Sequence, residues 1–299
     1  MASPSPQPVK TTASKAAKKP GLKPDLATLG GIALAMLGII GGLLLEHGSI
    51  SDVAQTTAAM IVMGGTFGAV LVTTPLPVFM RAIKGLSSAF FERGSSVPAT
   101  IETLIGYATK ARKNGIVSLE AEGAGITDPF LRKAVNLAVD GTDLQEIRKM
   151  MELDIALGEQ VSDAEAKVWE AAGGYAPTIG IIGAVMGLIQ VMKNLDDIKA
   201  VGHGIAVAFV ATVYGVASAN IFFLPVANKL KARIRAETLL KDLIVEGVVG
   251  IVEGLNPTLI RLKLEAYNHE PKKEAKGKPG AAPGPGAKSK PGAQPPGES

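Results

Sequence analysis

Residues 175–192 read YAPTIGIIGAVMGLIQVM, a stretch without any Asp, Glu, Lys or Arg. Three more stretches share this property: Leu26–Leu45, Val53–Phe79 and Gly204–Asn228. A helix rises about 1.5 Å per residue and the hydrocarbon layer is about 30 Å thick, so a membrane span needs roughly 20 apolar residues. All four stretches are therefore predicted to be membrane-spanning helices.

The composition agrees with a membrane protein that also has a sizeable soluble part. Of the 299 residues, 47% are hydrophobic, 19% are charged and only 4% are aromatic. The sequence contains no cysteine, which excludes disulfides, Cys-ligated metal sites and thiol catalysis. The net charge of +4 is small, so its distribution is more informative than its size.

Lysine and arginine gather beside some ends of the spans and are missing from others. The connection 46–52 has none, and in the other short connection Lys193 and Lys199 are offset by Asp196 and Asp197. Because positive flanks stay in the cytoplasm, we expect both termini and the segment between spans two and three to be cytoplasmic. The same pattern favours contact with membrane lipid over nucleic acid. The basic flanking residues are Lys10, Lys15, Lys18, Lys19, Lys23, Arg81, Lys84, Lys229, Lys231, Arg233 and Arg235.

The predicted fold class is an all-α membrane protein with four transmembrane helices in two hairpins and a helical cytoplasmic domain. The first span is expected to remain as a helix, since it is longer than a signal-peptide core and residues 45–48 offer no small-x-small cleavage site. Both ends are rich in Pro, Ala and Lys, which predicts disorder. The expected boundaries are 1–24 for the N-terminal tail, 25–80 for spans one and two, 81–174 for the helical domain, 175–228 for spans three and four, 229–265 for C-terminal cytoplasmic helices and 266–299 for the final tail.

Outside the spans, apolar residues recur with helical spacing. Possible capping boxes, Thr142 with Gln145 and Ser162 with Glu165, predict helix starts near Asp143 and Asp163. A helix after the fourth span should end or be interrupted at Asn256–Pro257. No alternating β pattern of useful length is present. The apolar stripes are Ile101, Leu104, Ile105 and Ala108; Leu144, Ile147, Met151 and Ile155; and Leu240, Ile244, Val248, Ile251 and Leu255.

Spans three and four are rich in small residues, which allow helices to approach closely in lipid. Either these residues pack spans of one chain together, or they form an inward face that receives the helices of another subunit. Pro177 is expected in the first turn of span three, whereas Pro225 should remove a hydrogen bond late in span four or kink it. The small residues are Gly183 and Gly187 in span three, and Gly204, Ala208, Thr212, Ala211, Gly215 and Ala219 in span four.

These motifs resemble the flagellar stator family of MotA, within the MotA/TolQ/ExbB proton channels. The similar segments are GYAPTIGIIGAVMG at 174–187, ATVYG at 211–215 followed by Pro225, and ARKNGIVSLE at 111–120. The resemblance extends over residues 25–260. It implies an ion-driven motor in the bacterial inner membrane: a homo-pentamer around a MotB dimer, whose aspartate takes up and releases the ion. That agrees with spans that lack a carboxylate.

The resemblance also implies roles for single residues. Arg112 and Glu120 would contact the rotor switch protein FliG, although the pair could equally be an ordinary solvated face. Pro177 and Pro225 would be the functional prolines. Thr212 would lie near the ion path, unless its hydroxyl simply bonds its own helix backbone.

The expected ion is H⁺ rather than Na⁺. Sodium-driven relatives carry threonine where Ala184 stands, and alanine has no oxygen to replace a water of hydration. No resident cofactor or metal is expected.

Three other functions agree less well with the sequence. An energiser of the TolQ/ExbB type would have three spans, and a secondary solute transporter would show broken helices or a polar site at mid-membrane. An enzyme is not expected, because His47, His203 and His269 are far apart in the sequence and no nucleophile, phosphate loop or metal-ligand spacing occurs.

Overall fold

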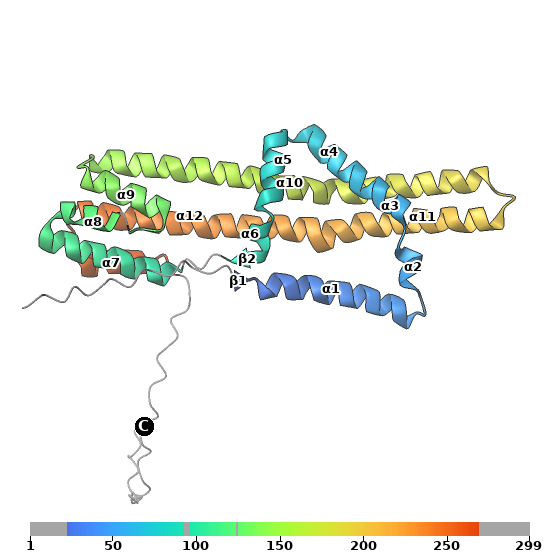
Figure 1. Cartoon of the computed structure of the whole chain (residues 1–299), viewed down its shortest axis with the longest axis horizontal. Coiled ribbons are helices and arrows are strands. Elements are labelled where there is room, and N and C mark those ends of the chain that lie inside the picture. The colour runs from blue at the N-terminus through green and yellow to red at the C-terminus, as the bar shows by residue number, and fades with distance from the viewer. Residues whose placement is uncertain (1–22, 93–95, 124, 269–299) are drawn as a thin grey trace, which may run out of the picture. The chain divides into compact units, whose positions relative to one another are not determined.

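The part of the chain that the computed structural model describes, residues 23–92, 96–123 and 125–268, is built almost entirely from helices (Figure 1). The only strands in these ranges, β1 (Lys23–Pro24) and β2 (Phe91–Glu92), form a short antiparallel pair. The all-α fold class is therefore confirmed, whereas disorder in 1–22 and 269–299 stays a prediction, because these residues lie outside the described ranges.

The helices are α1 Leu26–Leu45, α2 Ile50–Val53, α3 Thr56–Ala59, η1 Met60–Gly64, α4 Gly65–Thr73, α5 Leu76–Gly85, α6 Ser87–Phe90, α7 Val97–Asn114, η2 Ile116–Leu119, α8 Glu120–Gly123, α9 Pro129–Val139, α10 Leu144–Lys193, α11 Ile198–Ala217, η3 Ser218–Phe223, α12 Leu224–Val252 and α13 Pro257–Glu265.

Four helical stretches are long and apolar enough to cross a membrane, as predicted. They are α1, the continuous run α3–η1–α4 (Thr56–Thr73), and parts of α10 and of the continuous run α11–η3–α12. The second span is shorter than expected. Thr74 is extended, with φ −126° and ψ 131°, because the residue before a proline is disfavoured in the α conformation, and α5 starts only after Pro75.

Two long helices run side by side and connect the membrane part to the rest of the protein (Figure 1). One is α10 with 50 residues, and the other is the run from Ile198 to Val252. The helix start expected near Asp163 is wrong, since α10 continues through it without a break. Pro177 also lies inside α10 instead of in a first turn.

The predicted apolar stripes outside the spans meet in one hydrophobic core, the helical-domain core. Ile101 and Leu104 of α7, Ile147 and Met151 of α10, and Ile244 of α12 are all buried there. The last helix, α13, packs onto the same core. As predicted, α10 starts next to Asp143, whose carboxylate accepts the backbone N–H of Gln145, and the chain is interrupted before Pro257.

Within the membrane part, α10 and α11 approach closely along their small residues. A Cβ on Gly187 would lie 2.8 Å from the carbonyl oxygen of Gly204, and one on Gly215 would lie 2.5 Å from that of Ala176. The ridges therefore pack against each other inside one chain, which is the first of the two alternatives raised by the sequence. Small residues are needed here because any side chain would force the backbones apart.

An aromatic cluster surrounds the π-helical segment η3 and consists of Phe67, Phe79, Phe90, Trp169, Phe222 and Phe223. Trp169 stacks on Phe223 at 6.2 Å between ring centroids and meets Phe222 edge to face. The cluster lies where the first half of α10 passes into its membrane part, and its rings come from α10, η3 and the segments around span two.

Candidate functional site

Arg112 and Glu120 lie on either side of one turn. Arg112 is in the last turn of α7 and Glu120 begins α8, with the tight η2 turn between them. Gly115 starts this turn at φ 80°, a conformation that favours glycine, and the hydroxyl of Ser118 donates to its carbonyl at 2.6 Å. The conformation of this turn therefore fixes the backbone positions of Arg112 and Glu120 relative to each other.

Both side chains are exposed, and within the described ranges neither forms an ion pair or a side-chain hydrogen bond. Two nearby residues do form an ion pair: Lys110 of α7 and Glu122 of α8 lie 2.6 Å apart and connect the two sides of the turn. A cavity of about 310 Å³ opens beside Arg112, lined among others by Ala111, Ile116 and Gly141. The turn can thus offer one positive and one negative charge to another molecule.

The two functional prolines implied by the resemblance lie on the two neighbouring long helices, Pro177 within α10 and Pro225 at the start of α12. Gly173, four residues before Pro177, is so close to Leu224 that a Cβ on it would lie 2.5 Å from a methyl carbon of that leucine. Leu224 directly precedes Pro225, which follows the π-helical segment η3. A π-turn is one way in which a helix absorbs a break in its hydrogen-bond ladder. Pro225 therefore borders the contact between Leu224 and Gly173, which lies about one helical turn before Pro177.

Ala184 and Thr212 border the tight contact between α10 and α11. Each directly follows a residue of that contact, since a Cβ on Gly183 would lie 2.8 Å from the Cβ of Ala211. Both are half-buried. The Thr212 hydroxyl donates to the carbonyl of Ala208 at 3.2 Å, so it does bond its own helix backbone. Ala184 contributes no oxygen.

Acidic groups are absent from the charge-free stretches of the spans. The acidic side chains that flank these stretches in sequence are Asp25, Glu46, Asp52, Glu170, Asp196 and Asp197. Across the described ranges, no three His, Asp or Glu side chains are grouped so that they could hold a metal ion. The membrane part of this chain therefore has no carboxylate that could bind and release a proton within the bilayer.

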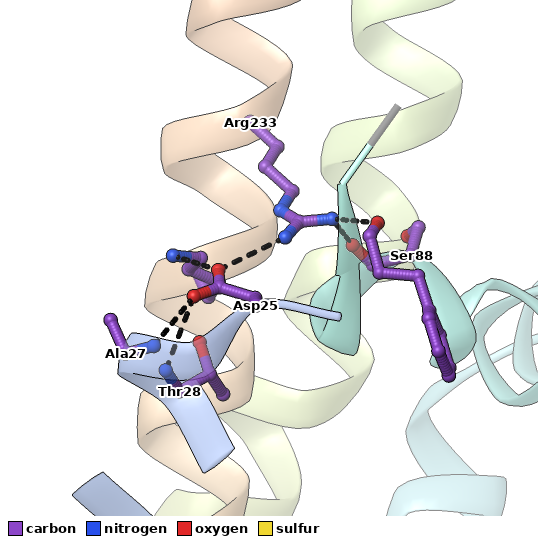
Figure 2. Close-up of polar contacts among 7 residues, drawn as sticks. Asp25, Ala27, Thr28, Ser88 and Arg233 are labelled. Carbon is purple, nitrogen blue, oxygen red and sulfur yellow. Dashed lines mark hydrogen bonds and ion pairs between the residues drawn. The ribbon is translucent and has the colours of Figure 1, made fainter. Parts of the chain in front are cut away.

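A polar cluster that the sequence did not predict joins the start of α1 to α12 (Figure 2). The Asp25 carboxylate accepts the backbone N–H groups of Ala27 and Thr28, and it pairs with Lys229 at 2.5 Å and with Arg233 at 3.1 Å. Asp25 before an apolar run is a helix N-cap signal, but nothing in the sequence indicates its partners more than 200 residues away.

Arg233 extends the cluster to a third segment. Its guanidinium also donates to the backbone carbonyls of Ser88 in α6 and Phe91 in β2, which follow span two and α5 and are called here the turn after span two. The Asp25 side chain is only 10% exposed. Hydrogen bonding from Lys229, with further bonds from Thr28 and Arg233, holds the pKa of Asp25 far below its ordinary range despite burial. We call Asp25, Lys229, Arg233 and the two carbonyls the α1 clasp.

Two family models match the chain over most of its length. Residues 29–115 match the motility protein A N-terminal family, and residues 122–242 match the MotA/TolQ/ExbB proton channel family. Motility protein A of Bacillus subtilis is 35% identical over 247 residues, which cover 81% of this chain and 90% of that protein. The chain belongs to the MotA/TolQ/ExbB family.

Solved structures of MotA-containing complexes are also similar. The structure of C. jejuni MotAB matches with a TM-score of 0.78 and 34% identity, over 81% of this chain and 95% of that one. The flagellar MotAB stator complex of Bacillus subtilis matches with a TM-score of 0.77 and 33% identity, over 83% and 97% of the two chains. The predicted family, the multi-pass membrane fold and the function as a flagellar stator subunit are thereby confirmed.

Proposed function

We propose that this chain assembles with a MotB-type partner in the bacterial inner membrane and couples proton flow to torque on the flagellar rotor. In this assembly five copies surround a MotB dimer, and both termini and the helical domain are cytoplasmic. The observation that carries the proposal is the complete lack of charged side chains in all four spans. A proton carrier must then come from another chain.

The surface of the membrane part supports an assembly in which spans contact lipid and other helices. No residue of α1 is buried, and most of the large apolar side chains of α10 beyond Gly180 are exposed, such as Ile182, Val185 and Leu188. The tight small-residue contact between α10 and α11 is already filled within the chain. A partner helix would therefore meet the remaining faces of these two spans.

The rotor contact is proposed at Arg112 and Glu120, against the switch protein FliG. An exposed ion pair contributes roughly 0.2–1 kcal/mol, whereas one charge crossing 100 mV releases about 2.3 kcal/mol. Contacts of this strength can form and break within a single ion step. Unpaired, exposed charges of both signs on one turn suit such a transient contact.

We propose H⁺ as the ion. A sodium ion needs several oxygen ligands to replace its waters of hydration, and the side chain of Ala184 offers none. Swimming should continue in sodium-free medium and stop after addition of a protonophore. Loss of swimming on removal of sodium alone would contradict the choice of H⁺.

Other functions have less support. An energiser of periplasmic transport would not explain the match of residues 29–115 to a motility protein family. A solute transporter would need a polar site at mid-membrane, where these spans carry apolar and small residues. Enzymatic activity is not proposed, because the functional residues found here suit ion flow and protein contacts.

The direct test of the proposed function is complementation. The chain and its one-span partner are expressed together in a bacterium whose own stators have been deleted, and swimming is recorded. Restored swimming is expected with the pair and not with this chain alone. If the pair is present in the membrane but cells stay immobile, while periplasmic transport in an energiser-deficient strain recovers, the energiser function replaces the stator function.

A further inference from the structure

Within the described ranges, the first span does not contribute to the hydrophobic cores of its own chain. Helix α1 contains no buried residue, and within the described ranges none of its residues belongs to a hydrophobic core. Its main contacts are with α2, which follows it, and with α6 and η3. Since apolar surfaces gain little from association in lipid, polar contacts at the ends of α1 must set its position.

The α1 clasp provides such contacts at the N-terminal end. In addition to its side-chain contacts, Asp25 donates its backbone N–H to the carbonyl of Phe90 at 2.8 Å. Strand β1, which directly precedes Asp25, pairs with β2. The guanidinium of Arg233 bonds Asp25 on one side and two carbonyls on the other. Its planar, forked shape makes this bridging possible, which the single point charge of lysine would not allow.

The clasp lies on the helix that leads to the helical domain. Helix α12 continues from Arg233 without interruption to Val252 and enters the helical-domain core, where Gly247 packs on Leu104 of α7. Arg112 is in the last turn of that same helix α7. A force on the exposed turn at Arg112 therefore reaches Arg233 through packed helices.

We propose that Asp25 and Arg233 are positioning residues that fix the membrane start of α1 and the turn after span two to α12 while the helical domain is under mechanical load. This inference rests on the proposed stator function. The clasp keeps the spans in place against the pull of the rotor, and it takes no part in carrying the ion.

The test is the torque of single motors at different loads, measured with attached beads of different size. Asp25→Asn keeps an N-cap oxygen for Ala27 and Thr28 but loses the charge that holds Lys229 and Arg233. We expect torque near stall to fall roughly twofold or more, because the shared partner of two half-buried cations is removed, with little change in speed at low load. The matched control is Asp197→Asn, since Asp197 caps α11 in the same way without an ion pair in the described part of the chain. This control should behave as the unaltered protein at every load.

Two more variants keep the proposal testable if Asp25→Asn does not reach the membrane. Arg233→Lys retains a charge for Asp25 but loses the bridge to Ser88 and Phe91, so it should also lower torque near stall. Lys229→Gln leaves the bridge intact and should have the smaller effect. An unchanged torque-load curve, or an equal fall at all loads, would overturn the clasp inference. If the unaltered chain itself does not restore rotation, the proposed function fails instead.

Discussion

At the scale of single residues, Arg112 and Glu120 are exposed charges without an ion pair in the described ranges, whereas several charged residues of the same domain are paired. Lys110 bonds Glu122 on the same turn, Arg261 bonds Glu102, and Lys263 bonds Glu246 within the helical domain. Paired charges can stabilise the domain itself, whereas exposed charges without a partner contribute little to it. The proposed rotor contact gives Arg112 and Glu120 a role outside the chain.

Reversal of both charges, Arg112→Glu with Glu120→Lys, should impair swimming and leave the amount of protein in the membrane unchanged. Both side chains are exposed, so we expect a change in the unfolding free energy of no more than about 0.5 kcal/mol. Swimming speed and immunoblots of membranes measure the two effects. Lys149→Glu, an exposed change on α10, serves as the control. Normal swimming of the double variant would remove these residues from the rotor contact.

Asp242 on α12 carries a charge that its surroundings disfavour. Burial, together with the negative charges of Glu152 and Glu159, raises the pKa of Asp242. Because the ionised form is less favourable in the folded protein than in the unfolded one, Asp242→Asn should stabilise the protein at pH 7, by roughly 0.5 kcal/mol as for other like-charge contacts. The gain should vanish below about pH 4, where aspartate is protonated in both states. Thermal unfolding in detergent at both pH values measures it, and a gain that grows on acidification would contradict the assignment.

At the scale of elements, the contact between α10 and α11 depends on glycine at a few positions. Gly215→Ala would place a methyl group against the carbonyl oxygen of Ala176, and such overpacking destabilises a protein by about 1–3 kcal/mol. Gly202→Ala on the same helix is the matched control, since nothing lies within 4 Å of its Cβ position. Thermal unfolding of the two variants should differ clearly. Equal stability of the two variants would show that α10 and α11 can move apart at Gly215 without a cost in unfolding free energy.

The π-helical segment η3 and Pro225 form one irregular element inside an otherwise continuous helix. Pro225→Ala restores a backbone N–H, so a regular α-helix should replace η3. The rings of Phe222 and Phe223 should then change position relative to Trp169. We expect lower torque with normal amounts of protein, together with a shifted fluorescence emission of the single tryptophan. Unchanged torque and emission would argue against a hinge at this position.

The elements also show where sequence patterns are sufficient. The bounds of α1 follow from the charge-free run between Asp25 and Glu46, and the helical-domain core follows from residues such as Ile147 and Met151 at helical spacing. Sequence patterns do not predict the structure correctly where packing against another helix determines it. Pro177 reads as a helix start, yet α10 continues through it because its other residues pack along α11 and α12.

At the scale of the whole molecule, the α1 clasp could not have been predicted from this sequence. Its parts come from the start of α1, the turn after span two and α12, so only the tertiary fold brings them together. The charged turn at 112–120 and the two prolines were found because their local sequence resembles a known family. Their roles in rotor contact and in hinge motion stay predictions.

The spans of this chain contain no carboxylate side chain, and the proposed function requires that a transmembrane helix of another protein supplies the group that carries the proton. The most direct measurement is proton flux into vesicles that contain the purified chain alone, the chain with its one-span partner, or the chain with that partner after its membrane aspartate is changed to asparagine. We predict gradient-driven flux only with the unaltered partner. Proton flux coupled to the gradient through the chain alone would contradict the account.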